Sequence, residues 1–504
     1  MTTGALGALA ERALKWSALT TVARFALQLV AQVALARLLG PGNFGVYGIG
    51  MAVLTFVGFL SGASFSYGLM LQSRLSEEDI RFAFTWQMAA GILSAAAMYA
   101  AAAPLAAFFG DARVEGMVQL LSLASLLVAA AAPATYLLQR DLNFRALGLI
   151  QLASYAAGYL LVGVPLALAG FGAWALGTAC VVQSAVALAA TYRARPHPLR
   201  PLWRHAGGGE TLSTGRTVFL TNVVNWLLGN LDRVIIGRVL NTHAVGLFTV
   251  AYNLASIPNV LLIGAFQPAF MAAGAKLQDD RARLAQGWLL GVACAVVLGT
   301  PAAVVLALLS GDIVGFLYGD AWLESAWVLG VMFLCLPAWA AWGLSTPVLW
   351  NTQRKQHEFL LQLPVLALAA PAWWFFAPSG IRGIAIVSAC VILGRSLVIV
   401  TAALRALELR WRAIASPAAR GLALAALCAL AVLAGQHATA GLASHLAALA
   451  AGGLAAAGAM LLVLVLRPSL LGAEALSAIT RLAPRVAARI TRNGTVAASR
   501  ETAA

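Results

Sequence analysis

The chain has 504 residues, of which 61% are hydrophobic and only 10% are charged, with a formal net charge of +15. Soluble proteins carry about 25% charged residues, so a soluble body of this length would lack the polar side chains to cover its surface. The composition excludes a soluble enzyme, a secreted disulfide scaffold, a disordered chain and a nucleic-acid binder. It indicates an all-α polytopic membrane protein.

Membrane-spanning helices need about 20 mostly apolar residues each. Because backbone polar groups must be satisfied within lipid, each such run is expected to be a helix. The sequence contains fourteen of them, at 16–39, 44–71, 83–107, 116–138, 146–169, 171–192, 216–240, 244–271, 285–309, 325–350, 359–377, 381–403, 418–435 and 445–466.

Basic residues concentrate on one side of this alternation. If the N-terminus is cytoplasmic, 26 of the 33 Lys and Arg residues fall in cytoplasmic segments. The opposite side holds four, namely Arg37, Arg113, Arg238 and Arg382. The positive-inside rule therefore predicts that both termini are cytoplasmic and that the number of spans is even.

All five cysteines lie inside apolar runs, without a metal-binding spacing to one another or to histidine. The sequence therefore predicts neither a disulfide framework nor a metal site, and it implies no cofactor.

The longest internal cytoplasmic segment divides the chain. We expect an N-terminal six-helix lobe at 1–192, a basic linker at 193–215, a C-terminal six-helix lobe at 216–404, two appended helices within 405–466, and a basic cytoplasmic tail at 467–504. The helix pair that opens each lobe carries a similar turn. At an offset of 201 residues, Arg37 aligns with Arg238, Leu39 with Leu240, Gly45 with Gly246, and Tyr47 with Phe248. This favours an internal repeat, as found in transporters, although glycine-rich hairpins also resemble one another by chance.

Two stretches carry a more specific resemblance. The turn Arg37-Leu-Leu-Gly-Pro-Gly-Asn-Phe-Gly-Val-Tyr47 and the stretch from Asp232 to Leu254 resemble signatures of the bacterial Wzx-type polysaccharide flippases. These belong to the multidrug/oligosaccharidyl-lipid/polysaccharide exporter superfamily, and the likeness runs from about residue 15 to 405. Asn241-Thr-His243 departs from the pattern, because relatives more often have Gly and a carboxylate there; we expect no change of function from it.

The resemblance implies two six-helix lobes in a V around a central cavity, with two appended helices. It also implies movement of undecaprenyl-diphosphate-linked oligosaccharide from the inner to the outer leaflet of the bacterial inner membrane.

Arg24 lies inside the first apolar run, with Gln28 and Gln32 following at helical spacing. A charge at bilayer depth costs about 2.5–3.5 kcal/mol, so it normally faces a bundle interior or a wet cavity. A guanidinium can bind a diphosphate through paired hydrogen bonds. We therefore predict that this stripe contacts the substrate; the alternative is a packing arginine satisfied by a carbonyl or by Gln28.

The seventh apolar run repeats this pattern. Asn222, Asn225 and Asp232 share one helical face, and Arg233 lies at its edge. Neighbours on an α-helix point about 100° apart, so Asp232 and Arg233 each need another partner. We predict substrate contacts for Asn222, Asn225 and Arg233, and ion coupling for Asp232; a structural ion pair with another helix is the alternative for Asp232.

Three further residues complete the predicted substrate-binding set. Tyr252 and Asn253 are expected beside the cavity, where they could bind sugar, although aromatic residues near helix ends often mark the membrane interface. Arg395 in the twelfth run either lines the cavity or extends toward the cytoplasmic interface.

The sequence lacks a G-x-x-x-x-G-K-[ST] loop and a long extramembrane domain. It therefore favours a secondary carrier that works by alternating access, and not an enzyme. The expected partners are the lipid-linked oligosaccharide, bilayer lipids, and the polymerase and glycosyltransferases of the same pathway. A drug or cation antiporter of the superfamily and a peptidoglycan lipid precursor flippase stay open as alternatives. A membrane-embedded polymerase or ligase would need a large periplasmic catalytic loop.

Overall fold

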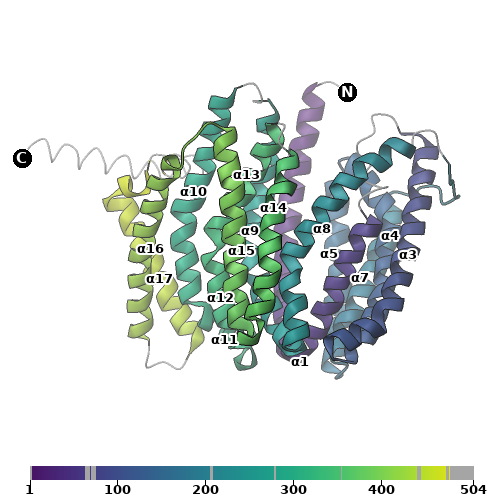
Figure 1. The fold of residues 1–504 in the computed structure, drawn as a ribbon, viewed down its shortest axis with the longest axis horizontal. Coiled ribbons are helices and arrows are strands. Elements are labelled where there is room, and N and C mark those ends of the chain that lie inside the picture. The colour runs from purple at the N-terminus through teal and green to yellow at the C-terminus, as the bar shows by residue number, and fades with distance from the viewer. Residues whose placement is uncertain are drawn as a thin grey trace, which may run out of the picture. The chain divides into compact units, whose positions relative to one another are not determined.

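The chain is represented by a computed structural model, and every regular element in its described residues is a helix (Figure 1). The structure describes residues 3–62, 69, 75–204, 208–276, 280–352, 355–439, 444–472 and 476. Within these ranges some side chains lie outside the description, among them those of 3–15 and 208–222.

The helices follow one another through short connections. The long ones are α1 (Thr3–Gly62), α3 (Glu77–Phe109), α4 (Arg113–Arg140), α7 (Ala173–Ala194), α8 (Gly208–Val239), α9 (Thr242–Lys276), α10 (Arg281–Leu308), α14 (Lys355–Phe376), α15 (Gly380–Ala406), α16 (Arg412–Ala438) and α17 (His445–Leu466). The shorter ones are α5 (Phe144–Tyr155), which continues through a π-helix (Ala156–Gly163) into α6 (Val164–Leu168), and α11 (Ser310–Tyr318), α12 (Ser325–Leu334) and α13 (Leu336–Asn351). Short 3₁₀ turns lie at Asp320–Trp322, Ala377–Ser379 and Pro468–Leu471.

Where the structure describes them, the fourteen expected spans fall on helices; residues 63–68, 70 and 71 of the second expected span lie outside the described residues. Ten helical stretches of the described residues are long and apolar enough to cross a membrane, or up to eleven with the α12–α13 pair, which bends by 48°. Two of the ten, Leu19–Gly58 and Leu360–Ala406, have 40 and 47 residues, about twice the length that crosses a ~30 Å core at 1.5 Å per residue. Glycines with positive φ, Gly40 at 70° and Gly380 at 77°, interrupt them where the sequence predicts a break. The prediction of an all-α polytopic membrane protein is confirmed.

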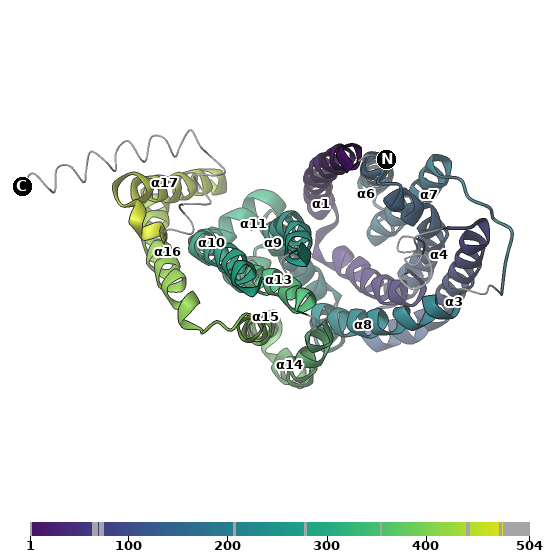
Figure 2. The ribbon, with the colours of Figure 1, turned by 90° about the horizontal axis from the view of Figure 1, so that it is seen from above.

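Two compact units make up the fold. The first unit comprises Met1–Thr249 and Trp373–Ile381, and the second unit comprises Val250–Ala372 and Arg382–Ala504. In the first unit α4 packs between α3 and α7, as the view from above shows (Figure 2). The division falls inside α9, and the lobe boundaries expected from the sequence stay a prediction.

The two appended helices are anchored within the second unit. α16 and α17 pack against each other and α16 lies along α10. Asp312 of α11 joins both: its carboxylate accepts from Gln436 Nε2 of α16 at 3.1 Å and lies 3.0 Å from His445 Nδ1 of α17. A glycine allows α16 and α17 to pack closely, since a Cβ atom on Gly435 would lie 2.8 Å from the Ala451 carbonyl oxygen.

The two similar turns contact each other inside the first unit. A Cβ atom on Gly45 would collide with the carbonyl group of Thr242, and one on Gly246 would collide with the carbonyl group of Pro41. Both glycines are therefore required by backbone-to-backbone packing between the segment that follows the Gly40 break in α1 and the first turns of α9. The alignment of Gly45 with Gly246 thus marks a physical contact between the two repeated segments.

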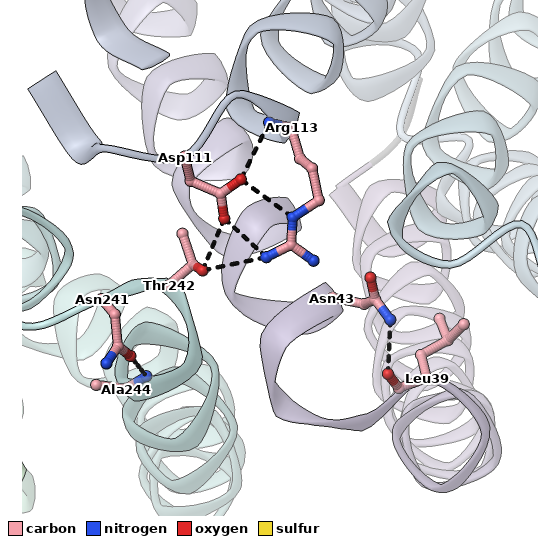
Figure 3. A network of polar contacts seen from close by, with 7 residues as sticks. All are labelled: Leu39, Asn43, Asp111, Arg113, Asn241, Thr242 and Ala244. Atoms are coloured by element: carbon pink, nitrogen blue, oxygen red, sulfur yellow. Dashed lines mark hydrogen bonds and ion pairs between the residues drawn. The ribbon is translucent and has the colours of Figure 1, made fainter. Parts of the chain in front are cut away.

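Polar contacts extend this junction (Figure 3). Asp111, in the turn between α3 and α4, accepts from the Thr242 hydroxyl at 2.9 Å and from Arg113 Nη2 at 2.7 Å. The hydrogen bonds from Arg113 and Thr242 outweigh desolvation and lower the pKa of Asp111. Asn241 caps α9 by accepting from the Ala244 amide at 2.8 Å. Asn241 and Thr242 therefore both serve this junction.

Of the linker expected at 193–215, residues 193–194 belong to α7 and residues 208–215 to α8. Residues 195–203 form a strap that lies along the first unit. Arg81 Nε of α3 donates to the Arg200 carbonyl at 3.1 Å, the Leu202 amide donates to Thr85 Oγ1 at 2.8 Å, and Trp86 Nε1 donates to the Trp203 carbonyl at 3.3 Å. These bonds satisfy backbone groups that no helix or sheet provides for. The strap is thus a packed part of the first unit.

His197 lies at the centre of the strap. It is only 6% exposed, and its ring contacts Phe84 and Tyr192 at centroid distances of 5.2 and 5.3 Å. Its Nδ1 lies 3.3 Å from the Pro198 carbonyl oxygen, and its buried Nε2 has no hydrogen-bond partner in the described residues. Burial, assisted by the charge of Arg195 and opposed by the Pro198 carbonyl, lowers the pKa of His197 from 6.5.

We expect Gly45→Ala to destabilise the protein by about 1–3 kcal/mol, because the added methyl group meets backbone that cannot move away without shifting a helix end. Thermal unfolding of the purified protein measures the effect. Gly42→Ala in the same turn is the matched control, since no atom lies within 4 Å of its added Cβ. Equal melting temperatures for the two variants would contradict the proposed packing.

We expect the strap to loosen as the pH falls below 6.5. The folded-state pKa of His197 is lowered, so its contribution to stability is complete above 6.5 and is lost as the pH falls toward the folded-state value. Hydrogen–deuterium exchange at Leu202, corrected for intrinsic rates, should show less protection at pH 5.5 than at 7.5. His197→Phe keeps an aromatic ring without titration, and the pH effect should disappear in it; a persisting effect would assign it elsewhere.

Candidate functional site

Arg24 contacts a second helix of the first unit. Its Nη1 donates to Gln151 Oε1 of α5 at 2.9 Å, and its guanidinium lies 5.6 Å from the Phe25 ring centroid. Arg24 is half-buried and Gln151 is exposed. The Nε atom of Arg24 is buried and makes no hydrogen bond within the described residues. The guanidinium is therefore held in place by one amide and keeps an unused donor.

A row of aromatic hydroxyl groups continues from Gln151. Tyr155 follows one turn later and stacks on Tyr159 of the π-helix at a centroid distance of 4.5 Å. The Tyr159 hydroxyl is hydrogen-bonded to the Tyr47 hydroxyl at 2.5 Å. Tyr47 is the aromatic residue of the repeated turn, so this row connects α5 to that turn.

The predicted stripe on α1 is half-buried at Gln28 and Gln32 as well as at Arg24. Sequence periodicity could not find Gln151 and Tyr155, because they lie more than 120 residues further along the chain. The signal they leave in the sequence is weak: one polar and one aromatic residue lie four positions apart in an apolar run. In the structure the predicted stripe on α1 is extended by polar groups of α5, because Arg24 contacts Gln151 and Tyr155 follows one turn later.

On α8 the two charged residues are buried, Asp232 at 2% and Arg233 at 8% exposure. Asp232 Oδ1 accepts from the backbone amide of Arg233 at 2.8 Å. Arg233 Nη1 turns back along its own helix and donates to the Gly229 carbonyl at 2.6 Å and to Asn230 Oδ1 at 3.1 Å. Hydrogen bonds within its own helix therefore offset part of the cost of burying Arg233. The angle between Asp232 and Arg233 on the helix does not predict such a partner.

The two predicted asparagines of α8 differ in what the structure describes. Asn225 is half-buried, whereas the side chain of Asn222 lies outside the described residues. Between them and Asp232, Trp226 Nε1 donates to Thr55 Oγ1 of α1 at 3.1 Å, and its ring lies 4.8 Å from that of Phe56. This contact fixes α8 against the second half of α1.

Arg395 is buried in the second unit at 8% exposure, so the interpretation that it extends to the interface is wrong. Its Nη2 donates to Gln362 Oε1 of α14 at 2.6 Å, and its guanidinium lies 4.2 Å from the Trp342 ring centroid. Gln362, only 1% exposed, in turn donates to the Glu358 carbonyl at 3.1 Å. A hydrogen bond and a cation–π contact together compensate for desolvation of the charge.

Glu358 is a polar residue that sequence reasoning missed. Its side chain is 7% exposed and accepts from Trp350 Nε1 at 2.7 Å. It stands at the start of α14 beside the basic pair Arg354 and Lys355, where it reads as part of a hydrophilic loop. Only the fold shows that it is buried together with Gln362.

Tyr252 and Asn253 face different surroundings in the second unit. The Tyr252 ring meets Trp339 edge-on at 5.3 Å, so it has a packing contact. Asn253 is exposed, and its backbone carbonyl accepts a hydrogen bond from the Ser256 hydroxyl at 2.7 Å. The predicted set is therefore divided: Arg24, Gln28, Gln32, Asn222, Asn225, Asp232 and Arg233 belong to the first unit, and Tyr252, Asn253 and Arg395 to the second.

This arrangement suits binding more than bond-breaking chemistry. Fixed guanidinium groups with amide and hydroxyl neighbours can hold an anionic group and sugar hydroxyls. Within the described ranges, no group of three or more His, Cys, Asp or Glu side chains is placed to hold a metal ion. All five cysteines are free.

Comparison with known proteins agrees with the two sequence stretches. A family model described as polysaccharide biosynthesis protein matches residues 34–327. The succinoglycan biosynthesis transport protein ExoT of Rhizobium meliloti is 27% identical over 322 residues, which are 63% of this chain and 64% of that protein. The lipopolysaccharide biosynthesis protein WzxC of Escherichia coli is 23% identical over 314 residues, 61% of this chain and 63% of its own length. The similarity thus spans a little under two thirds of these relatives, and the resemblance to polysaccharide flippases is confirmed.

Solved structures share the fold at low sequence identity. The lipid II flippase MurJ in an inward closed conformation has a TM-score of 0.68 at 12% identity, over 88% of this chain and 97% of that chain. An inward-facing multidrug resistance MATE family transporter of the MOP superfamily has a TM-score of 0.56 at 12% identity, over 76% and 94%. These likenesses establish the helical architecture.

We expect Arg395→Leu to lower stability by about 2–4 kcal/mol, because it leaves Gln362 buried without its charged partner. Thermal unfolding of the purified protein provides the measurement. Arg382→Leu is the matched control: Arg382 is exposed and only lies over the Trp327 ring at 5.9 Å. If both variants melt at the same temperature, the buried cluster does not support the second unit.

Proposed function

This chain is a member of the polysaccharide biosynthesis protein family, and from that membership we propose that it is a secondary transporter for a lipid-linked polysaccharide precursor. The substrate in this proposal is an undecaprenyl-diphosphate-linked oligosaccharide, moved from the cytoplasmic to the periplasmic leaflet by alternating access. Two relatives, a succinoglycan biosynthesis transport protein and a teichuronic acid biosynthesis protein of Bacillus subtilis, are named for polysaccharide polymers. Their names support the proposal that the precursor is used to build such a polymer.

The observation that carries the proposal is the state of Arg24. It is a permanent charge in an apolar helix, held by the amide of Gln151, and its Nε donor has no protein partner in the described residues. A diphosphate offers the acceptors and the negative charge that such a guanidinium needs. The Nε atoms of Arg233 and Arg395 likewise make no hydrogen bond within the described residues. Those two residues are only 8% exposed, whereas Arg24 is half-buried, which makes Arg24 the best placed of the three for a ligand that comes and goes.

The polar neighbours give the rest of the site its roles. Gln28, Gln32 and Tyr155 are proposed to provide donors and acceptors for sugar hydroxyl groups next to Arg24, whereas Gln151 only holds the guanidinium. Asn222, Asn225, Arg233, Tyr252, Asn253 and Arg395 are proposed to contact the substrate during the cycle. Asp232 is proposed to carry the coupling ion, because a desolvated carboxylate can take up a proton or a cation and release it when its surroundings change.

The proposed setting is the bacterial inner membrane, with both termini in the cytoplasm as the basic segments indicate. O-antigen, capsule and exopolysaccharide assembly are the pathways that this reaction would serve. The glycosyltransferases that build the oligosaccharide would act before this step, and a polymerase would act after it.

Arg24→Ala should abolish polymer export in a deletion strain at an unchanged protein level, because the diphosphate loses its charged partner. Polymer on the cell surface and protein in the membrane fraction are measured together. Arg145→Gln is the charge-matched control: Arg145 is exposed at the other end of α5, where it lies over the Trp16 ring at 4.9 Å.

Gln151→Leu separates binding from packing. If Arg24 served only to join α1 to α5, removing Gln151 would reduce export as strongly as removing Arg24. In the proposed role, Gln151→Leu frees the guanidinium and export is largely kept. Normal export in Arg24→Ala, or equal loss in both variants, would overturn the assignment.

A further inference from the structure

An apolar cleft of about 470 Å³ lies in the second unit between α13, α14 and α15. Leu349, Leu361 and α15 residues 397, 398 and 402 line it, and Arg405 completes the lining. The volume is in the range of about 300–1,000 Å³ that is usual for ligand pockets. None of these residues belongs to the predicted substrate-binding set.

The walls of the cleft are apolar over most of its length. Leu397 is 57% exposed, and the neighbouring Leu360 and Leu393 are 56% and 50% exposed. The hydroxyl group of Thr401 donates to the Leu397 carbonyl at 2.5 Å, so it is occupied within its own helix. In a membrane-spanning segment, a cleft with such walls suits a hydrocarbon chain and offers nothing to a peptide backbone.

Arg405 gives the cleft a charged end. It lies eight residues after Leu397, about 12 Å along the helix, in the last turn of α15. It is exposed, and its guanidinium has no hydrogen bond or ion pair within the described residues. The exposed Trp411 follows between Arg410 and Arg412, a combination typical of the level of lipid headgroups.

We propose that this cleft binds an anionic phospholipid, with one acyl chain between α13, α14 and α15 and the phosphate at Arg405. Charge complementarity identifies the occupant, because an apolar slot that ends at an unpartnered guanidinium matches a single chain with a negative headgroup. The undecaprenyl chain of the proposed substrate is several times too long for the slot. The leaflet in which the lipid sits rests on the proposed orientation, whereas the binding itself is independent of transport.

Native mass spectrometry of the purified full-length protein in detergent tests this proposal. Dioleoyl phosphatidylglycerol is titrated against dioleoyl phosphatidylcholine, which has the same chains and no net charge. We expect one phosphatidylglycerol molecule to be retained in preference to phosphatidylcholine. Arg405→Gln should weaken its retention about fivefold, the effect of one basic side chain near a lipid headgroup.

Two further variants make the test specific to the cleft. Ala402→Phe fills the slot and should displace the lipid while Arg405 is kept. Arg412→Gln removes an equal charge from a residue that does not line the cleft and should leave retention unchanged. Melting temperatures are recorded for all variants, so that a folding defect is separated from a binding defect.

Equal weakening by Arg405→Gln and Arg412→Gln would show a diffuse attraction to basic residues and would overturn the proposal. Unchanged retention in a folded Ala402→Phe variant would exclude the cleft. Equal retention of phosphatidylcholine would overturn the selection of an anionic headgroup, because both lipids carry a phosphate and only phosphatidylglycerol has a net negative charge. None of these results depends on flipping, so failure here is distinct from failure of the proposed function.

Discussion

A charge inside a hydrocarbon layer must have a partner, and this constraint organises the polar part of the structure. An arginine at the bilayer centre costs about 2.5–3.5 kcal/mol on insertion scales. The three intramembrane arginines meet it differently: Arg395 through Gln362 and an aromatic ring, Arg233 through its own helix, and Arg24 through one amide on α5. The more completely a guanidinium is satisfied by protein, the less a ligand gains by binding it. This difference supports the proposal that Arg24 is the binding group.

The repeated turns show how a weak sequence echo can have a structural cause. Gly45 and Gly246 are each required because the other turn's backbone passes directly over them. A Cβ atom would collide with backbone at Gly45 and at Gly246, whereas Gly42 has open space around it and carries no such requirement. The Asp111–Thr242 hydrogen bond adds a polar lock beside this junction, at the ends of helices that the sequence places far apart.

Features with a local cause could be predicted from the sequence. Apolar length gives the positions of the spans, and the breaks at Gly40 and Gly380 follow from a residue type that tolerates positive φ. The polar stripe of Arg24, Gln28 and Gln32 follows from helical spacing. Pairings over long distances along the chain have no such signal: Gln151 lies 127 residues from Arg24, and Gln362 lies 33 residues from Arg395. The composition of the strap at 195–203 is that of a loop and predicts a linker, because its hydrogen bonds to α3 exist only in the folded state.

The two sides of the chain differ in how many arginines they hold and also in how many of those arginines contact other protein groups. On the side with few basic residues, Arg113 pairs with Asp111, Arg238 donates to the Phe108 carbonyl, and Arg382 covers Trp327. On the basic side some arginines are likewise used by the protein, as Arg195 is by Asp141. The side chains of Arg405, Arg410 and Arg412, in contrast, make no hydrogen bond or ion pair within the described residues. An arginine whose side chain makes no contact with the protein can attract an anionic lipid headgroup. In the proposed orientation such arginines lie at the acidic leaflet, which supports the proposal that Arg405 holds a lipid there.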